Sequence, residues 1–233
     1  MNVLEYEMID LLKELKEKYG VFEIKAEYEN EGSRQTELMR LKDIAEKINL
    51  PIILKIGGVE AVTDIYNALS LGVKGIIAPM AETAFAASKF LNAINTFVPE
   101  DNQKDIEFAM NIETITAYKN IDEILNLNKI NLLSGLTVGR VDFTASLGAD
   151  RSFSNSDEMF EYCTEIFQKA KKKGLKTALG GAISPEASSF IKKLASKNLI
   201  DKYETRKLVY HKDGIKNISE GLSSGVKFEL LWL

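Results

Sequence analysis

Two carboxylates, Glu113 and Asp142, follow two apolar segments that lie about thirty residues apart. The segments, residues 108–112 and 133–141, have the pattern of buried β-strands. A helix expected over residues 118–127 lies between them, and a strand–helix–strand crossover is almost always right-handed. Both strands then end at the same edge of a parallel sheet. Two neighbouring carboxylates repel each other unless a cation lies between them, and ligation by oxygen alone favours Mg²⁺ or Mn²⁺.

Strands and helices are expected to alternate along the whole chain, which predicts an α/β fold with a parallel sheet. The other expected strands are residues 21–27, 52–56, 75–79, 177–181 and 203–210, and the other expected helices are 8–18, 37–48, 61–71, 83–97, 157–173, 185–194 and 217–233. We predict a closed (β/α)8 barrel of the TIM type, because polar residues follow nearly every strand and no G-x-G-x-x-G motif follows the first. Seven strands are clear from the sequence. An eighth is uncertain and could lie near the N-terminus or over residues 226–233.

Length and composition agree with this interpretation. The 233 residues suit a single barrel domain, with an N-terminal helix within residues 1–20 and a C-terminal helix over residues 217–233. The net charge of −4 and the isoelectric point near 5.3 argue against nucleic acid as a partner. The single cysteine, Cys163, allows no intrachain disulfide, and no apolar segment approaches the roughly 20 residues of a membrane span. We therefore expect a cytoplasmic protein without a membrane partner.

At N-I-E-T (residues 111–114) and G-R-V-D-F-T-A-S-L-G (residues 139–148), the chain resembles the HpcH/HpaI aldolase and citrate lyase β-subunit family. The segment G-I-I-A-P-M-A-E-T (residues 75–83) adds to the resemblance, which spans residues 21–206. It implies a (β/α)8 barrel in which Glu113 and Asp142 ligate a divalent ion that also binds the carboxylate and keto oxygens of a 2-oxo acid. The implied chemistry is carbon–carbon cleavage or aldol addition through a pyruvate-type enolate, whose charge the metal stabilises.

Two departures from the family concern the charged residues around the expected metal. The family has an arginine where this chain has Lys55, which can supply the positive charge but not a bidentate fork. Aldolases of the family also have a histidine after the first strand, whereas the only histidine here is His211. Glu27 and Glu29 are the candidate proton-transfer residues in its place.

Each of these candidates also has a structural interpretation. Lys55 could pair with a neighbouring glutamate, and residues 25, 27 and 29 share one face of a strand, so Lys25 could form an ion pair there. Arg206 could bind an anionic substrate group or form a salt bridge to Glu204 or Glu27. Arg140 could hold a substrate carboxylate or order its own loop.

The sequence thus favours a Mg²⁺-dependent (or Mn²⁺-dependent) lyase or aldolase of the citrate lyase type that acts on a 2-oxo acid. Alternatives are a related metal-dependent enzyme acting on a phosphoenolpyruvate-like or acyl-CoA substrate, and a barrel that binds a ligand or scaffolds a partner without catalysis. The apolar segment 228–233 is expected to pack on the barrel or against another subunit. Because members of the resembled family are commonly oligomers, we expect a homo-oligomer.

Overall fold

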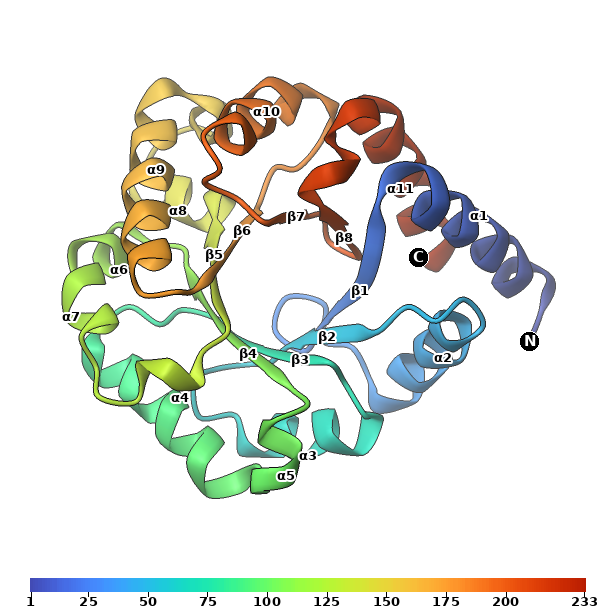
Figure 1. Cartoon of the computed structure of the whole chain (residues 1–233). Helices are drawn as coiled ribbons and strands as arrows, with labels where there is room; N and C mark the ends of the chain where they lie inside the picture. Colours follow the sequence, from blue (N-terminus) through green and yellow to red (C-terminus); the bar gives the residue numbers. More distant parts are fainter.

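The computed structural model describes residues 1–233 and forms a closed barrel of eight strands in the order β1 to β8, which confirms the predicted TIM-type barrel (Figure 1). The strands are β1 (Val21–Glu27), β2 (Ile52–Lys55), β3 (Gly75–Ala78), β4 (Glu107–Ile112), β5 (Gly135–Gly139), β6 (Lys176–Gly180), β7 (Lys202–Glu204) and β8 (Leu208–His211). Strands β1 to β7 are parallel to their neighbours in chain order. Their carboxyl ends therefore meet at one edge of the barrel.

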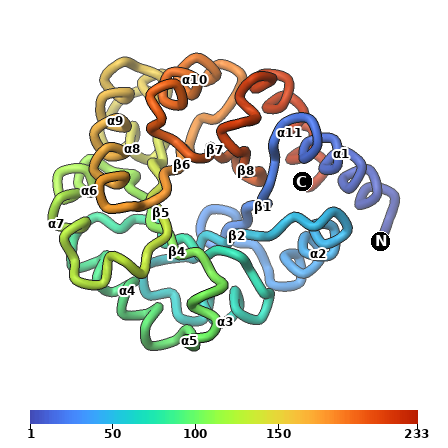
Figure 2. Tube along the Cα trace, viewed as in Figure 1, coloured from blue at the N-terminus to red at the C-terminus, as the bar shows by residue number.

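Helices surround the barrel, and the chain makes a single circuit that brings its last segments back beside its first (Figure 2). The α-helices are α1 (Val3–Tyr19), α2 (Gln35–Glu46), α3 (Val62–Leu71), α4 (Ala84–Phe97), α5 (Glu100–Gln103), α6 (Ile115–Lys119), α7 (Ile121–Leu125), α8 (Arg140–Ser146), α9 (Asp157–Lys172), α10 (Ser188–Ser196) and α11 (Ile218–Trp232). Short 3₁₀ helices are η1 (Ile130–Leu132), η2 (Arg151–Asn155), η3 (Pro185–Ala187) and η4 (Lys212–Asn217). A large apolar core fills the layer between the strands and these helices.

The eighth strand lies inside the segment predicted to be one strand, residues 203–210. That segment is a hairpin, in which β8 runs antiparallel to both β7 and β1. Thr205 forms the turn, since its backbone N–H donates to the Leu208 carbonyl and its hydroxyl accepts from the Leu208 N–H. The two suggested positions for an eighth strand were therefore wrong: the N-terminal residues form α1, and α11 continues to Trp232.

The strand–helix–strand unit around the two candidate metal ligands is present, but its helix and the position of Asp142 differ from the prediction. β4 and β5 are parallel, with Asn111 opposite Thr137, and Glu113 directly follows β4. The expected helix over residues 118–127 is instead two short helices, α6 and α7, that meet at Asn120. Asp142 does not end a strand, because β5 stops at Gly139 and Asp142 lies in the first turn of α8.

The two terminal helices pack side by side and close the ring (Figure 1). Asn2 and Glu5 form a capping box at the start of α1, and Gly20 ends the helix in the left-handed region at φ 74°. Gly221 of α11 lies where a Cβ would come within 3.0–3.3 Å of the Tyr19 side chain, so the glycine permits the close approach of the segments. The last turns of α11 lie beside the segment between β7 and β8, where the Lys207 backbone N–H donates to Glu229.

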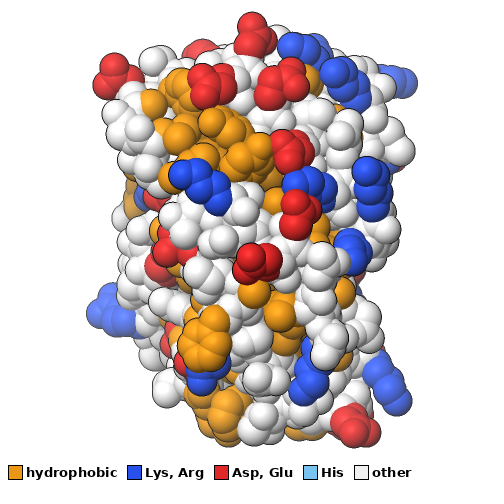
Figure 3. Space-filling model, turned by 90° about the vertical axis from the view of Figure 1, so that its left-hand side faces the viewer, with side chains coloured by type: hydrophobic (Ala, Val, Ile, Leu, Met, Phe, Trp, Pro, Cys, Tyr) orange, Lys and Arg blue, Asp and Glu red, His pale blue; other side chains and the backbone are white.

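The outer face formed by α7 and α9 has interspersed acidic and basic side chains (Figure 3). Lys169 of α9 lies 2.9 Å from the Asp122 carboxylate of α7 and 2.8 Å from Glu165. None of the helices combines the length and apolar character needed to span a lipid bilayer.

Candidate active site

A cavity of about 1380 Å³ opens at the carboxyl edge of the strands. Its inner part is lined by side chains from β1, β2, β4, β5 and β7, and its outer part by η2, the β7–β8 turn and the end of α11. In TIM barrels this edge carries the functional residues, because the loops that follow the strands converge there. Five of the seven site residues predicted from the sequence line the cavity: Glu27, Lys55, Glu113, Asp142 and Arg206. The other two do not line it: Glu29 contacts the lining residue Lys55, and Arg140 is buried behind the loops after β5 and β6.

Glu113 lies at the inner end of this cavity, and its carboxylate is held in place by two hydrogen bonds. Oε1 accepts from the Met80 backbone N–H at 3.0 Å, and Oε2 accepts from the Asn111 amide at 3.0 Å. Gly139 leaves room for it, since a Cβ at that position would lie 2.6 Å from Oε2. Burial raises the pKa of Glu113, and the nearby charge of Asp142 adds to the rise. Asp142 is half-buried, and burial raises the pKa of its carboxyl as well.

The donor set at these two residues fits a hard divalent cation. No group of three or more histidine, cysteine, aspartate or glutamate side chains has the geometry to hold a metal by itself. Mg²⁺, however, is commonly held by one or two carboxylates, with substrate and water at its other positions. Each oxygen of Glu113 keeps a lone pair beyond the hydrogen bond it accepts. Glu113 and Asp142 therefore have the right chemistry for the ligands that the sequence indicates.

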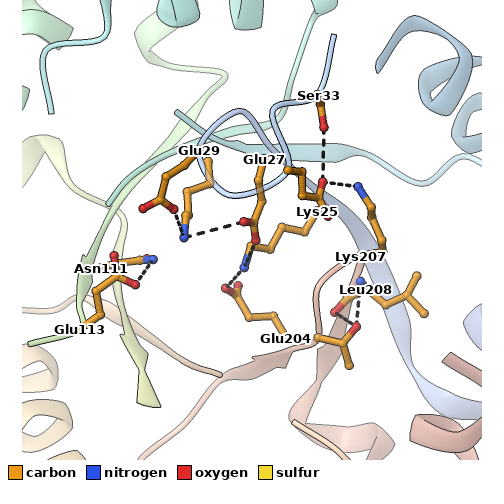
Figure 4. Close-up of polar contacts among 12 residues, drawn as sticks. Lys25, Glu27, Glu29, Ser33, Asn111, Glu113, Glu204, Lys207 and Leu208 are labelled. Atoms are coloured by element: carbon orange, nitrogen blue, oxygen red, sulfur yellow. Dashed lines mark hydrogen bonds and ion pairs between the residues drawn. The ribbon is translucent and has the colours of Figure 1, made fainter. Parts of the chain in front are cut away.

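A chain of alternating charges crosses the barrel interior from β7 to β2. Lys25 Nζ lies 2.8 Å from Glu204 Oε1 and 3.1 Å from Glu27 Oε1, so the ion pair considered from the shared face of β1 is present. Glu27 is opposite Lys55 in the register of β1 and β2, and Lys55 Nζ lies 3.8 Å from Glu27 Oε2. Lys55 also contacts Glu29 Oε2 at 2.5 Å. Figure 4 shows the end of the Lys25 side chain between the carboxylates of Glu27 and Glu204.

The charge chain fixes the ionisation of its members. Burial opposes the charged form of Glu27, but Lys25 and Lys55 outweigh it, so the pKa of Glu27 lies below its usual value. Burial likewise opposes the charge of Lys55, but Glu113 and Glu27 outweigh it and raise the pKa of Lys55. Lys55 therefore stays an ammonium group at neutral pH and provides a fixed positive charge near Glu113.

Arg140 does not reach the cavity, because its side chain is completely buried. The guanidinium donates to the carbonyls of Ser154 at 2.8 Å, Gly181 at 2.7 Å and Ala182 at 3.1 Å, and to Asn155 Oδ1 at 2.7 Å. It also lies over the Phe190 ring. Of the two roles considered for Arg140, the structure favours ordering of the loops after β5 and β6.

Arg206 and Lys207 both lie in the β7–β8 turn but have different environments. Arg206 is exposed, lines the cavity and forms no salt bridge to Glu204 or Glu27. Lys207 is buried, pairs with Glu31 and lies over the Trp232 ring at 5.3 Å. Its backbone N–H donates to Glu229 of α11 at 3.1 Å. The turn thus connects the loop after β1 to the end of α11.

Sequence reasoning gave no functional role to Glu204 or Asn111, although both are buried in the cavity. Glu204 was considered only as a partner of Arg206, and Asn111 only as part of a motif. For Asn111 the available signal was a polar residue near the end of a mostly apolar strand, whereas Glu204 lies among other polar residues and gave no such signal. The role of either residue depends on which strands are neighbours across the barrel, which the chain order alone does not give.

A model of the family described as HpcH/HpaI aldolase/citrate lyase matches residues 36–189, about two thirds of the chain. No curated protein matches the sequence.

Three solved structures with the same fold are similar to this chain over most of their length. The citrate synthase SbnG is 17% identical, with a TM-score of 0.69 over 97% of this chain and 90% of that one. An HpcH/HpaI aldolase/citrate lyase family protein from Burkholderia cenocepacia is 13% identical, with a TM-score of 0.64 over 86% of this chain and 83% of that one. The citrate lyase β subunit from Mycobacterium tuberculosis, in complex with oxaloacetate and magnesium, is 14% identical, with a TM-score of 0.54 over 85% of each chain.

Proposed function

This chain belongs to the HpcH/HpaI aldolase/citrate lyase family, and from that premise we propose that it is a divalent-metal-dependent carbon–carbon lyase or aldolase acting on a 2-oxo acid. The observation that carries the proposal is the arrangement of Glu113, Asp142 and Lys55 at one end of a large cavity. The similar fold of a citrate lyase β subunit that binds oxaloacetate and magnesium supports the same class of ligand.

Glu113 and Asp142 would hold the metal, and Mg²⁺ would supply Lewis-acid stabilisation of negative charge on oxygen. Lys55 provides a second positive charge that does not depend on the metal. Because Lys55 is buried and remains ionised, its charge acts in a medium of low dielectric, where it stabilises a developing enolate more strongly than in water.

Glu27 and Glu29 remain the candidates for proton transfer at the methyl carbon of the 2-oxo acid. Both contact Lys55, so either would move a proton beside the enolate that Lys55 stabilises. Glu27 is held by two lysines, whereas Glu29 contacts Lys55 alone and is more exposed. Glu29 therefore has more freedom to approach a substrate carbon.

Arg206 is the candidate for binding a second anionic group, because it lines the cavity and has no acidic partner. The alternative of a phosphorylated substrate would need further cations in the same place. Lys25, Lys55 and Lys207 are each paired with a carboxylate already. We therefore favour a carboxylic acid over a phosphate ester as the substrate.

The direct test is the exchange of pyruvate methyl protons in deuterated water, followed by proton NMR with and without Mg²⁺. Enolate formation predicts metal-dependent loss of the methyl signal. Asp142→Ala should abolish the exchange, and removal of the metal with EDTA should do the same in the wild type. Asp150→Ala is the matched control, since Asp150 is an exposed aspartate shortly after α8 and does not line the cavity.

Exchange in Asp150→Ala but not in Asp142→Ala would support the proposed role of the carboxylate. Exchange that continues without metal, or in Asp142→Ala, would contradict it. If the wild type neither exchanges the protons nor binds Mg²⁺ in a calorimetric titration, the lyase proposal is refuted in favour of a non-catalytic barrel.

A further inference from the structure

Glu204, the last residue of β7, differs from the other buried carboxylates of the cavity. It is 2% exposed, and its Oε1 accepts a hydrogen bond from Lys25 Nζ at 2.8 Å. Its Oε2 is buried and has no hydrogen-bond donor. Both oxygens of Glu113 accept hydrogen bonds, and each oxygen of Glu27 faces a lysine. Glu204 is therefore the buried acid of the cavity with an oxygen that has neither a hydrogen-bond donor nor a lysine in contact with it.

A buried carboxylate oxygen without a donor is unfavourable in a folded protein, and such groups are rare in native structures. Lys25 compensates the charge of Glu204 but reaches only one of its two oxygens. Glu204 lines a cavity that is large enough for a small organic acid. The missing donor is thus expected to come from a ligand that enters the cavity.

The residues around Glu204 indicate which kind of chemical group the ligand carries. A Cβ on Gly180 would lie 3.4 Å from Glu204 Oε1 and 3.4 Å from the Thr137 methyl group, so these side chains are neighbours. Asn111 is opposite Thr137 on the next strand, and its Oδ1 is also buried without a donor. Figure 4 shows Glu204 and Asn111 on opposite sides of the interior, which both side chains face. The inner cavity therefore offers acceptors to a ligand that has a hydrogen-bond donor, such as a hydroxyl group.

We propose that Glu204 is a catalytic residue that takes the proton from the substrate hydroxyl group during carbon–carbon cleavage, an inference that rests on the proposed function. The substrate class is then a 2-oxo acid with a hydroxyl on the carbon that becomes the aldehyde or ketone. Glu204 Oε2 accepts the hydroxyl proton, and the O–H electrons form the new C=O bond. The carbon–carbon bond breaks, and its electron pair stays with the 2-oxo acid fragment as an enolate. In the addition direction, Glu204 returns the proton to the new alkoxide.

Lys25 has a positioning role in this step. Its ammonium group fixes the Glu204 carboxylate through one oxygen only and leaves the other oxygen without a donor. The two proton transfers of the reaction, at the substrate hydroxyl and at the methyl carbon, then occur at two different places in the cavity. The hydroxyl proton goes to β7, whereas the methyl proton of the 2-oxo acid is handled beside Lys55 at β1 and β2.

This separation can be tested because the exchange of pyruvate methyl protons involves no alkoxide, whereas aldol addition forms an alkoxide that must receive a proton. The probes are pyruvate in deuterated water for exchange, and pyruvate with glycolaldehyde, glyoxylate or acetaldehyde for addition, all with Mg²⁺. In Glu204→Gln we expect addition to fall about 10²–10⁴-fold, the usual contribution of general acid–base catalysis, while exchange stays near the wild-type rate. Glu23→Gln is the matched control, because Glu23 is a buried glutamate paired with Lys202 at 2.9 Å outside the cavity.

Glu204→Asp provides a second variant if Glu204→Gln does not fold. It keeps a negative charge near Lys25 but withdraws the carboxylate, and it should show the same separation of the two reactions. Equal loss of exchange and addition, or wild-type addition in a folded variant, would overturn the role of Glu204. So would a wild type that exchanges pyruvate protons but adds to none of the three aldehydes. A wild type without exchange refutes the proposed function itself.

Discussion

Replacing Lys25 with methionine tests the buried charge chain directly. Methionine keeps most of the length and apolar volume of lysine, so the main change is the loss of the ammonium group. Two carboxylates then lose a partner, at 2.8 Å for Glu204 and 3.1 Å for Glu27. Glu27 keeps Lys55 at 3.8 Å, whereas no other salt-bridge partner remains for Glu204. Most of the cost therefore comes from Glu204.

Removing one partner of a buried ion pair destabilises a protein by about 3–5 kcal/mol, because the other charge stays buried without compensation. We expect a loss of about 4 kcal/mol at neutral pH. With a slope of about 3 kcal/mol/M for urea, the midpoint of unfolding should fall by roughly 1.3 M. This is a large part of the stability of a typical domain, about 5–15 kcal/mol, but the variant should still fold.

The dependence of this loss on pH has a definite sign. In the wild type the folded-state pKa of Glu27 lies below its unfolded value. Its charged form therefore stabilises the fold at pH values above the unfolded pKa, and this stabilisation is lost as the pH falls through the folded pKa. Without Lys25, burial opposes the ionised form of the two carboxyls that it contacted. The stability of the variant therefore falls as the pH rises and these carboxyls have to ionise in the folded state. The difference from the wild type should therefore be small near about pH 5 and large near about pH 8.

Urea unfolding followed by circular dichroism at both pH values, with EDTA present, measures this difference. Lys202→Met is the control, since Lys202 pairs with a single glutamate, Glu23, and is more exposed than Lys25. It should lose less stability. If Lys25→Met loses less than about 1 kcal/mol of stability, and equally at both pH values, the buried charge chain contributes no more than surface ion pairs do, and the reasoning is refuted.

Two further predictions concern the residues that surround Glu113 and the β5–β6 loops. Gly139→Ala would place a methyl group 2.6 Å from Glu113 Oε2 and so displace this carboxylate. A displacement of about 1 Å in a catalytic group lowers a rate about 10²-fold, and we expect pyruvate exchange to fall by this factor in a folded protein. Unchanged exchange by NMR would contradict this. Arg140→Met would leave four close acceptors without a donor, and we expect a loss of about 3 kcal/mol or more in urea unfolding. Arg151→Met, which removes an exposed arginine, should lose almost nothing, and equal losses in the two variants would contradict the role of Arg140.

The barrel could be predicted because its main signals are local. Apolar segments such as residues 108–112 have the length of buried strands, and glycines such as Gly20, Gly72 and Gly174 end the helices that separate them. Alternation of such segments leaves few possible topologies. The carboxyl edge of the sheet then follows from the parallel order, which explains why Glu113, Lys55 and Glu27 could be assigned to one cavity.

The hairpin of β7 and β8 was missed because its turn has no turn chemistry. Thr205, Arg206 and Lys207 include neither glycine, proline nor asparagine, and the polar and apolar residues around them continue without interruption. Asp142 was placed at a strand end for a similar reason, since Val141 and Phe143 extend the apolar pattern of β5 into α8. In both cases tertiary contacts decide where the strand stops.

The role of Arg140 was undetermined in the sequence because it depends on loops that are far away along the chain. Its partners come from residues 154–155 and 180–182, and no local pattern predicts that a guanidinium will be completely enclosed by backbone carbonyls. Glu204 presents the same difficulty. Its partner Lys25 is 179 positions away, and only closure of the barrel brings the two together.

The balance of charge in the inner cavity connects these observations to the proposed metal. Two lysines there face five carboxylates, namely Glu27, Glu29, Glu113, Asp142 and Glu204. An excess of three negative charges in a partly buried site is unfavourable unless a cation enters or a carboxyl takes up a proton. The lysines compensate Glu27, Glu29 and Glu204 by direct contact and leave Glu113 and Asp142, whose pKa values are both raised. A divalent cation is therefore expected at these two residues, because no basic side chain contacts either carboxylate directly.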